Sequence, residues 1–215
     1  MTVTLKLATS LDGRIATAAG QSKWITGEPA REAVHRLRSE HDAVLVGVET
    51  ALADDPELTV RLVPGFNGPQ PARVVLDSRQ RLGSDCKLVA TAREIPTYLV
   101  ATEEPDPRLV DAGVRVLHVR KVGEDRPELK TVVETLAAEG LHRLFVEGGG
   151  QVAASFLRCG LVDAIEWFRA PIIIGGEGRP GVGALAVAGL ADAPHFRRTE
   201  VREIGDDLWE RYARI

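Results

Sequence analysis

The segment that most restricts the fold is DAVLVGVE at 42–49, where six consecutive residues between two acids carry no charge. An apolar run of this length, without polar alternation, is typical of a strand covered on both faces. Other strand-like runs occupy 3–10, 73–79, 87–92, 97–102 and 114–119, and helical spacing of apolar residues marks 26–41 and 127–140. The alternation predicts an α/β fold with a mostly parallel central sheet and helices on both faces.

The last third of the chain adds three expectations. Residues 142–160 indicate a strand, a glycine turn and a helix, and 162–176 indicate one long strand. Residues 176–183 are expected to form a loop. A turn at Gly205–Asp207 between two strand-like arms predicts a C-terminal antiparallel hairpin. With no linker or repeat in view, we expect one domain over 1–215.

The amino-acid composition and charge exclude several classes of function. The net charge of −4 argues against a nucleic-acid partner, and no apolar run reaches the ~18 residues that a membrane span needs. The two cysteines are far apart, the five histidines form no metal-binding spacing, and the N-terminus has no export pattern. We therefore expect a cytoplasmic protein without a metal site, whose chemistry comes from acids, arginines, backbone groups or a cofactor.

The clearest local pattern is FVEGGGQVAASFL at 145–157, an apolar strand followed by three glycines and a helix. Such a turn lets backbone N–H groups approach a phosphate at the positive end of the helix. The alternative is a tight glycine turn without a ligand, since the GxGxxG pattern is absent. Glu147 favours a ligand site, because open α/β sheets bind ligands at the carboxyl ends of their strands.

Two further stretches are candidates for ligand contacts. In RVVLDSR, Ser78 and Arg79 suit a ribose 2′-phosphate, although the nearby Asp77 would favour the unphosphorylated cofactor and Arg79 could simply be solvated. In QSKWITG, Trp24 either packs at a helix entrance or forms a wall for a flat ligand.

Several motifs together resemble the pyrimidine reductases of riboflavin biosynthesis, in register over almost the whole chain. They are LKLATSLDGRIA, SKWITG, LADDPELTVR, RVVLDSR, VEGGGQVAASFL and the tail from APIIIGGEG to LADAPHFRRTEV. The resemblance implies a dihydrofolate-reductase-like fold. It also implies NADPH-dependent reduction of the ribosyl group of 5-amino-6-(5-phosphoribosylamino)uracil to a ribityl group. The zinc deaminase signature that often accompanies this domain is missing, so we expect a reductase domain without a fused deaminase.

The resemblance also implies roles for individual residues. NADPH would contact Ala8, Trp24, Thr50, Asp54, Ser78, Gly149, Gly150, Gln151, Val152, Ala153, Ala154 and Ser155, with Arg79 added from the LDSR pattern. The substrate would contact Ser22, Arg38, Leu58, Arg61 and Glu147.

The expected reaction is hydride transfer to C1′ of the ring-opened imine. Lys6 would donate a proton or orient the ribose, and Glu147 would accept hydrogen bonds from the uracil ring. Asp54 would stabilise positive charge near the reacting atoms. Asp55 is expected to point away and cap the turn before Pro56, because neighbours on an extended chain alternate. Arg38 and Arg61 would clamp the substrate phosphate.

Three alternatives stay open. A related reductase would act on the diaminopyrimidine before deamination, a dihydrofolate reductase would act on a pterin, and a non-catalytic relative would only bind NADP. The resemblance further implies a homodimer, for which 165–174 and the C-terminal hairpin are the candidate interface unless 165–174 lies in the centre of the sheet.

Overall fold

The structure, a computed structural model, describes residues 1–123 and 126–215. Its contacts divide the chain into two compact units. The first comprises Met1 and Leu37–Phe145, and the second comprises Thr2–Arg36 and Val146–Ile215.

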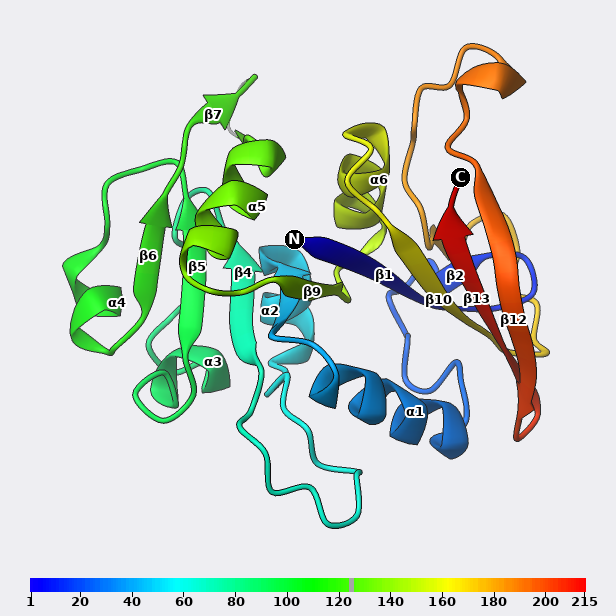
Figure 1. The fold of residues 1–215 in the computed structure, drawn as a ribbon, viewed down its shortest axis with the longest axis horizontal. Helices are drawn as coiled ribbons and strands as arrows, with labels where there is room; N and C mark the ends of the chain where they lie inside the picture. The colour runs from blue at the N-terminus through cyan, green and yellow to red at the C-terminus, as the bar shows by residue number, and fades with distance from the viewer. Residues whose placement is uncertain (124–125) are drawn as a thin grey trace. The chain divides into compact units, whose positions relative to one another are not determined.

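The first unit is built on parallel strands in the order β3, β4, β5 and β6. Their bounds are Ala43–Gly47, Ala72–Leu76, Thr97–Ala101 and Arg115–His118. Figure 1 shows β4, β5 and β6 side by side. Strands β3 and β5 are buried at every position, which requires cover on both faces of the sheet.

The helices of this unit are α2 to α5, with bounds Val48–Asp54, Lys87–Ala90, Pro107–Asp111 and Leu129–Ala138. One core cluster joins Val44, Val75 and Leu99 of the sheet to apolar residues of α2, α3 and α4. Two short strands, β7 (Lys121–Val122) and β8 (Arg126–Pro127), pair with each other. Helix α5 ends two residues before Gly140, which has a positive φ of 84°.

The second unit contains strands in the order β12, β13, β10 and β1, which are orange, red, dark yellow and blue in Figure 1. Their bounds are Phe196–Ile204, Asp207–Arg214, Ala164–Arg169 and Thr2–Thr9. Strands β1 and β10 are parallel, whereas β10 with β13 and β13 with β12 are antiparallel.

The remaining elements of the second unit are short. Strand β2 (Arg14–Ala16) pairs with β11 (Arg179–Pro180), and a 3₁₀ turn spans Leu190–Asp192. Helix α6 (Gly150–Arg158) follows the glycine turn after β9 (Arg143–Val146). Helix α1 (Glu28–Ser39) continues into the first unit at its last turn.

The α/β architecture with a largely parallel sheet and a C-terminal antiparallel hairpin is confirmed. No helix in the described residues is long and apolar enough to cross a membrane.

Three local predictions were wrong. Residues 87–92 form helix α3 rather than a strand, because a short apolar run does not distinguish the two. The strand within 162–176 stops at Arg169, two residues before Pro171, which lacks the N–H that a ladder needs. The strand at 42–49 ends at Gly47, and α2 follows it directly, so Asp54 and Asp55 do not lie on an extended chain.

The candidate dimer segment 165–174 also needs correction. Residues 165–169 belong to β10, which pairs with β1 on one side and β13 on the other and offers no open edge. Among the strands of the second unit, β12 stands at the end of the order.

Candidate functional site

The predicted site residues fall into both units. The first contains Arg38, Thr50, Asp54, Leu58, Arg61, Ser78 and Arg79. The second contains Lys6, Ala8, Ser22, Trp24, Glu147 and the 149–155 segment.

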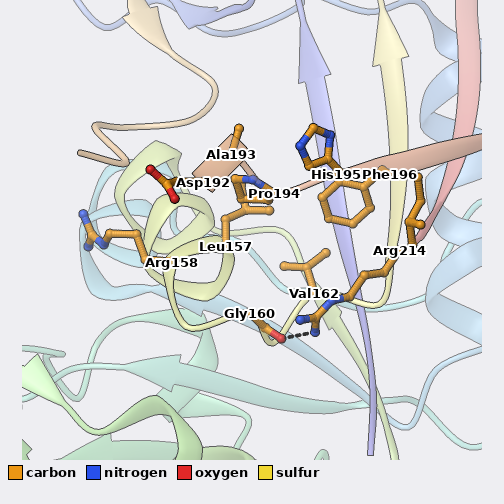
Figure 2. Close-up of a pocket in the computed structure, with 11 residues that line it drawn as sticks. Leu157, Arg158, Gly160, Val162, Asp192, Ala193, Pro194, His195, Phe196 and Arg214 are labelled. Carbon is orange, nitrogen blue, oxygen red and sulfur yellow. Dashed lines mark hydrogen bonds between the residues drawn. The ribbon is translucent and has the colours of Figure 1, made fainter. Parts of the chain in front are cut away.

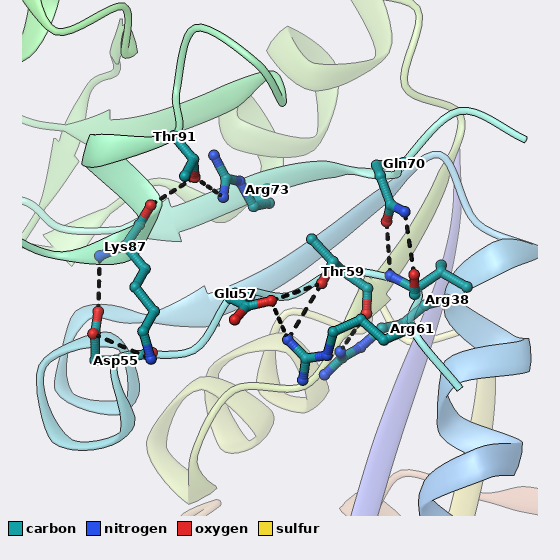
Figure 3. A network of polar contacts seen from close by, with 10 residues as sticks. Arg38, Asp55, Glu57, Thr59, Arg61, Gln70, Arg73, Lys87 and Thr91 are labelled. Carbon is teal, nitrogen blue, oxygen red and sulfur yellow. Dashed lines mark hydrogen bonds and ion pairs between the residues drawn. The ribbon is translucent and has the colours of Figure 1, made fainter. Parts of the chain in front are cut away.

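The two adjacent aspartates have different surroundings. Asp54 is the last residue of α2 and is exposed. Asp55 adopts a left-handed conformation with φ of 40°, and its carboxylate accepts a hydrogen bond from the backbone N–H of Lys87 at 2.9 Å. The Lys87 Nζ lies 3.5 Å from the same carboxylate (Figure 3). Asp55 therefore connects α2 to α3, and Asp54 has no part in that link.

The two arginines of the predicted phosphate clamp meet at Thr59. Arg38 Nη1 donates to the Thr59 carbonyl at 2.9 Å, and Arg61 Nη1 lies 3.3 Å from the Thr59 hydroxyl (Figure 3). Arg61 also pairs with Glu57 at 2.5 Å, and this hydrogen bond holds the pKa of Glu57 below its usual value. The structure thus brings these two arginines together, with an acid beside them that the sequence reading missed.

Leu58 is buried and belongs to the apolar core of the first unit. Its φ of 55° is uncommon for a branched residue and turns the chain between Glu57 and Thr59. A substrate contact at this position would therefore have to involve the backbone of Leu58.

Ser78 and Arg79 occupy the centre of a turn in which the Gln80 N–H donates to the Asp77 carbonyl at 3.1 Å. Asp77 is fully buried, and its carboxylate accepts from the Leu82 N–H at 3.0 Å. Burial raises the pKa of Asp77. Because its side chain faces the inside of the turn, Asp77 is not available to bind a ribose, which removes the objection to a phosphate contact here.

In the second unit, Lys6 and Ala8 lie two residues apart on β1 and so share one face of the sheet. Lys6 stands opposite Glu166 on β10, and Ala8 stands opposite Phe168. Both predicted residues are half-buried.

Trp24 is 69% exposed, and the Arg31 guanidinium from α1 lies 4.4 Å from its ring centroid. Trp24 is therefore not a core residue, and its contact with Arg31 is consistent with packing at the start of α1. A wall for a flat ligand stays a prediction. Ser22, two residues earlier, is half-buried.

The triple-glycine turn begins after Glu147, which is half-buried, and Gly149 is the N-cap of α6 without a side-chain cap hydrogen bond. Gly150 packs against the segment 178–183: a Cβ there would collide with the Pro180 carbonyl, and the Gly183 N–H donates to the Gly150 carbonyl at 2.8 Å. A glycine at 150 is thus required by the neighbouring backbone, and the phosphate contact at this turn stays a prediction.

The 178–183 segment also contacts the turn after β1. The Gly181 N–H donates to the Gly13 carbonyl at 2.8 Å, and β11 pairs with β2. The Asp12 carboxylate in the same turn accepts from the N–H groups of Ile174 and Gly175 at 3.1 and 2.8 Å. The structure therefore connects the end of β1 to the glycine turn through residues that were expected to be a plain loop.

An open pocket of about 310 Å³ lies at the opposite end of α6 (Figure 2). Leu157, Val162 and Phe196 supply apolar surface, and Arg158, His195 and Arg214 supply polar groups. None of the predicted site residues lines it, so this pocket is separate from the candidate site.

The chain is similar to known proteins over almost its whole length. The family described as the RibD C-terminal domain matches residues 1–209. The riboflavin biosynthesis protein RibD of Bacillus amyloliquefaciens is 36% identical over 211 residues, which are 96% of this chain and 55% of that protein. The 2,5-diamino-6-ribosylamino-4(3H)-pyrimidinone 5′-phosphate reductase of Methanothermobacter thermautotrophicus is 38% identical over 211 residues, or 98% and 96% of the two chains.

A solved structure of Acinetobacter baumannii RibD superposes with a TM-score of 0.89 at 30% identity, covering all of this chain and 58% of that one. The chain spans about half the length of the RibD proteins that it matches. The fold is therefore the dihydrofolate-reductase-like α/β fold of RibD-type reductases. Since the family match covers nearly every residue, the chain belongs to the RibD C-terminal domain family.

Proposed function

We propose that this chain is an NADPH-dependent reductase that converts the ribosyl group of 5-amino-6-(5-phosphoribosylamino)uracil to a ribityl group in riboflavin biosynthesis. The observation that supports the proposal most directly is the meeting of Arg38 and Arg61 at Thr59. Two guanidinium groups at one point form an anion site that suits a sugar phosphate.

The donors in the chain also fit an anionic dinucleotide. The N-terminus of α6 begins at an N-cap glycine, so backbone N–H groups rather than a side chain define that end. Ser78 and Arg79 stand at the centre of a turn whose only acid faces inward. We propose that Ala8, Trp24, Thr50, Ser78, Arg79 and the 149–155 segment hold NADPH, which when bound supplies the hydride.

The other roles are assigned to the chain's own side chains. Asp54 stabilises positive charge at the substrate imine, which becomes electrophilic at C1′ on protonation. Lys6 donates that proton or orients the ribose, and Glu147 accepts hydrogen bonds from the pyrimidine N–H groups. Ser22 and the backbone at Leu58 complete the substrate contacts, and the arginine pair holds the phosphate. Positioning both reactants in this way would account for much of the rate gain.

A second substrate has a specific observation in its favour. The Methanothermobacter relative, named as a reductase of the diaminopyrimidinone, is matched over 96% of its length. We therefore keep the aminated pyrimidine as the alternative substrate of the same site.

The test is an assay of NADPH oxidation with three substrates supplied in parallel: the deaminated pyrimidine, the aminated pyrimidine and dihydrofolate. We expect turnover with the deaminated pyrimidine. Faster turnover with the aminated compound would reassign the substrate. Turnover with dihydrofolate alone, or with none of the three, would contradict the proposal.

We also propose that the protein forms a homodimer. Strand β12 stands at the end of the sheet order in the second unit, and pairing along its edge would extend that sheet. Sedimentation equilibrium giving a monomer mass at micromolar concentration would contradict it.

A further inference from the structure

Beside the Ser78–Arg79 turn lies another arginine, for which neither the sequence reading nor the family comparison assigns a role. Arg81 Nη2 donates to Glu49 Oε1 at 2.6 Å, and Arg81 Nε lies 3.8 Å from Asp77 Oδ1. Glu49 and Arg81 are both accessible, with side chains 82% and 44% exposed. Arg81 is thus held between a buried acid inside the turn and a solvated acid outside it.

The buried acid fixes where Arg81 lies. Asp77 Oδ1 is buried, and in the described part of the chain it accepts no hydrogen bond. Burial raises the pKa of Asp77, and backbone hydrogen bonds from Leu82 and Arg81, followed by the Arg81 charge, oppose that effect. Arg81 Nε is thus the guanidinium atom that lies near Asp77, while Nη2 faces Glu49.

The turn itself is rigidly connected. The Gln80 side chain accepts from the Asp106 N–H at 2.7 Å and donates to the Glu104 carbonyl at 2.7 Å. The Thr102 N–H donates to the Ser78 carbonyl at 3.1 Å. Ser78, Arg79 and Arg81 are consequently presented from a fixed backbone.

The Glu49–Arg81 pair joins two segments that carry proposed cofactor residues. Glu49 precedes Thr50 on α2, and Arg81 follows Ser78 and Arg79. We propose that Arg81 is a second guanidinium for the 2′-phosphate of NADPH and that Glu49 competes with that phosphate for it. Glu49 thereby reduces the selectivity for NADPH over NADH. This inference rests on the proposed function.

Exchanging Glu49 for the 2′-phosphate as the partner of Arg81 should cost little free energy. A solvated carboxylate–guanidinium pair contributes little free energy, so a phosphate, with more charge and three acceptor oxygens, displaces the carboxylate readily. The Glu49 side chain swings into water, whereas Asp77 stays in place behind Arg81. Removing the Glu49 charge should therefore favour ligands with a 2′-phosphate and leave others unaffected.

The test measures the dissociation constants of NADP⁺, NAD⁺ and 2′-AMP by titration calorimetry at low salt. We expect Glu49→Gln to tighten NADP⁺ and 2′-AMP by about two- to fivefold, the range of exposed ion pairs, with no change for NAD⁺. Arg81→Ala should weaken NADP⁺ by about tenfold and leave NAD⁺ unchanged. In the double variant, Glu49→Gln should no longer tighten the binding of NADP⁺, because the Arg81 guanidinium for which Glu49 competes is absent.

Two controls keep the result interpretable. Glu139→Gln removes an equal charge from another exposed pair, with Arg115 at 3.8 Å, and should change nothing. Arg81→Ala combined with Asp77→Asn avoids leaving a buried carboxylate without its cation, should Arg81→Ala alone fail to fold. Equal effects of Glu49→Gln on NADP⁺ and NAD⁺, or a gain that persists without Arg81, would overturn the inference.

The failure of the inference is distinguishable from failure of the proposed function. A protein that prefers NADP⁺, loses this preference on Arg79→Ala and ignores changes at Glu49 and Arg81 contradicts only the inference. A wild-type protein that binds neither dinucleotide contradicts the proposed function as well.

Discussion

The Asp55 carboxylate accepts a hydrogen bond from the Lys87 backbone N–H, 32 residues further along the chain, at 2.9 Å. It thereby satisfies an N–H at the start of α3, where helices lack internal acceptors. The neighbouring Asp54 has no share in this bond and is exposed. The adjacent acids thus separate into one that stabilises the fold and one that is available for chemistry.

Replacing Asp54 with Asn should lower turnover strongly, by about tenfold or more, because the proposed role is a charge near the reacting atoms. The melting temperature should stay within about a degree of wild type, because exposed positions contribute little to stability. Steady-state kinetics and thermal unfolding of the same preparation would check both statements. An unchanged kcat would remove Asp54 from the mechanism.

Replacing Asp55 with Ala should show the opposite pattern. The variant loses the acceptor for Lys87 and places alanine at a positive φ, for a combined cost of about 2 kcal/mol in unfolding free energy. Asp55→Asn keeps an acceptor and tolerates that backbone, so it serves as the matched control and should cost clearly less. If both variants unfold at the same urea concentration, the link to α3 contributes nothing.

Replacing Arg61 with Ala should raise KM for the phosphorylated substrate by about ten- to a hundredfold, the range expected for a hydrogen bond to a charged group. The kcat should change less. Glu57→Gln removes the acid paired with Arg61 and should lower KM slightly, since the guanidinium then has one competitor fewer. A substrate analogue without the phosphate is the discriminating control: equal losses with both substrates would refute the phosphate assignment.

Arg73 offers a test of stability away from the candidate site. It is 1% exposed, and its guanidinium donates to the hydroxyls of Thr91 and Thr97 and to two backbone carbonyls (its bond to Thr91 appears in Figure 3). Arg73→Met should lower the unfolding free energy by about 3 kcal/mol or more, because these buried acceptors lose their donor. Arg143→Ala, which removes an exposed partner of Asp42, should cost about 1 kcal/mol or less in the same urea titration.

The decrease in unfolding free energy at acidic pH should depend on Asp12. Its pKa is lowered from 3.8 to about 2, first by the Ser10 hydroxyl and then by the Ile174 N–H. A depressed carboxyl pKa stabilises the fold above the unfolded value of 3.8, and this contribution disappears as the pH falls through about 2. Wild type and Asp12→Asn should therefore differ most at neutral pH and converge toward pH 2 in urea unfolding. A constant difference across that range would contradict this linkage.

The order of elements was largely predictable from the sequence, because buried parallel strands and amphipathic helices leave clear patterns of apolar residues. Residues 97–102 and 129–138 illustrate this. The structure of short segments was not predictable in this way. KLVA at 87–90 is apolar enough for either state, and the acceptor that makes it helical, Asp55, is distant in the sequence. The predicted strand ran past the end of β10 at Arg169, although Pro171 lacks the N–H that a sheet ladder needs.

For the candidate site, the sequence motifs predicted which residues take part but not which groups each of them contacts. That Arg38 and Arg61 meet at Thr59 depends on how α1 and the 57–61 segment fold, which no local pattern specifies. The Glu57–Arg61 ion pair could have been predicted from the sequence, since its opposite charges stand four residues apart. The Glu49–Arg81 ion pair could not, because its members are 32 residues apart.

The close packing of 178–183 on the glycine turn restricts how this part of the chain can change. A Cβ at Gly150 would collide with the Pro180 carbonyl oxygen, which only a movement of the main chain would relieve. A Cβ at Gly178 would meet the side chains of Ile174 and Arg14 at less than 3.0 Å, and one at Gly181 would meet the Thr9 side chain at 3.0 Å. A substitution at any of these glycines should therefore need an adjustment of the residues that its side chain would meet. A glycine-rich stretch in such a chain can record where two parts of its own backbone touch, as well as where a ligand is received.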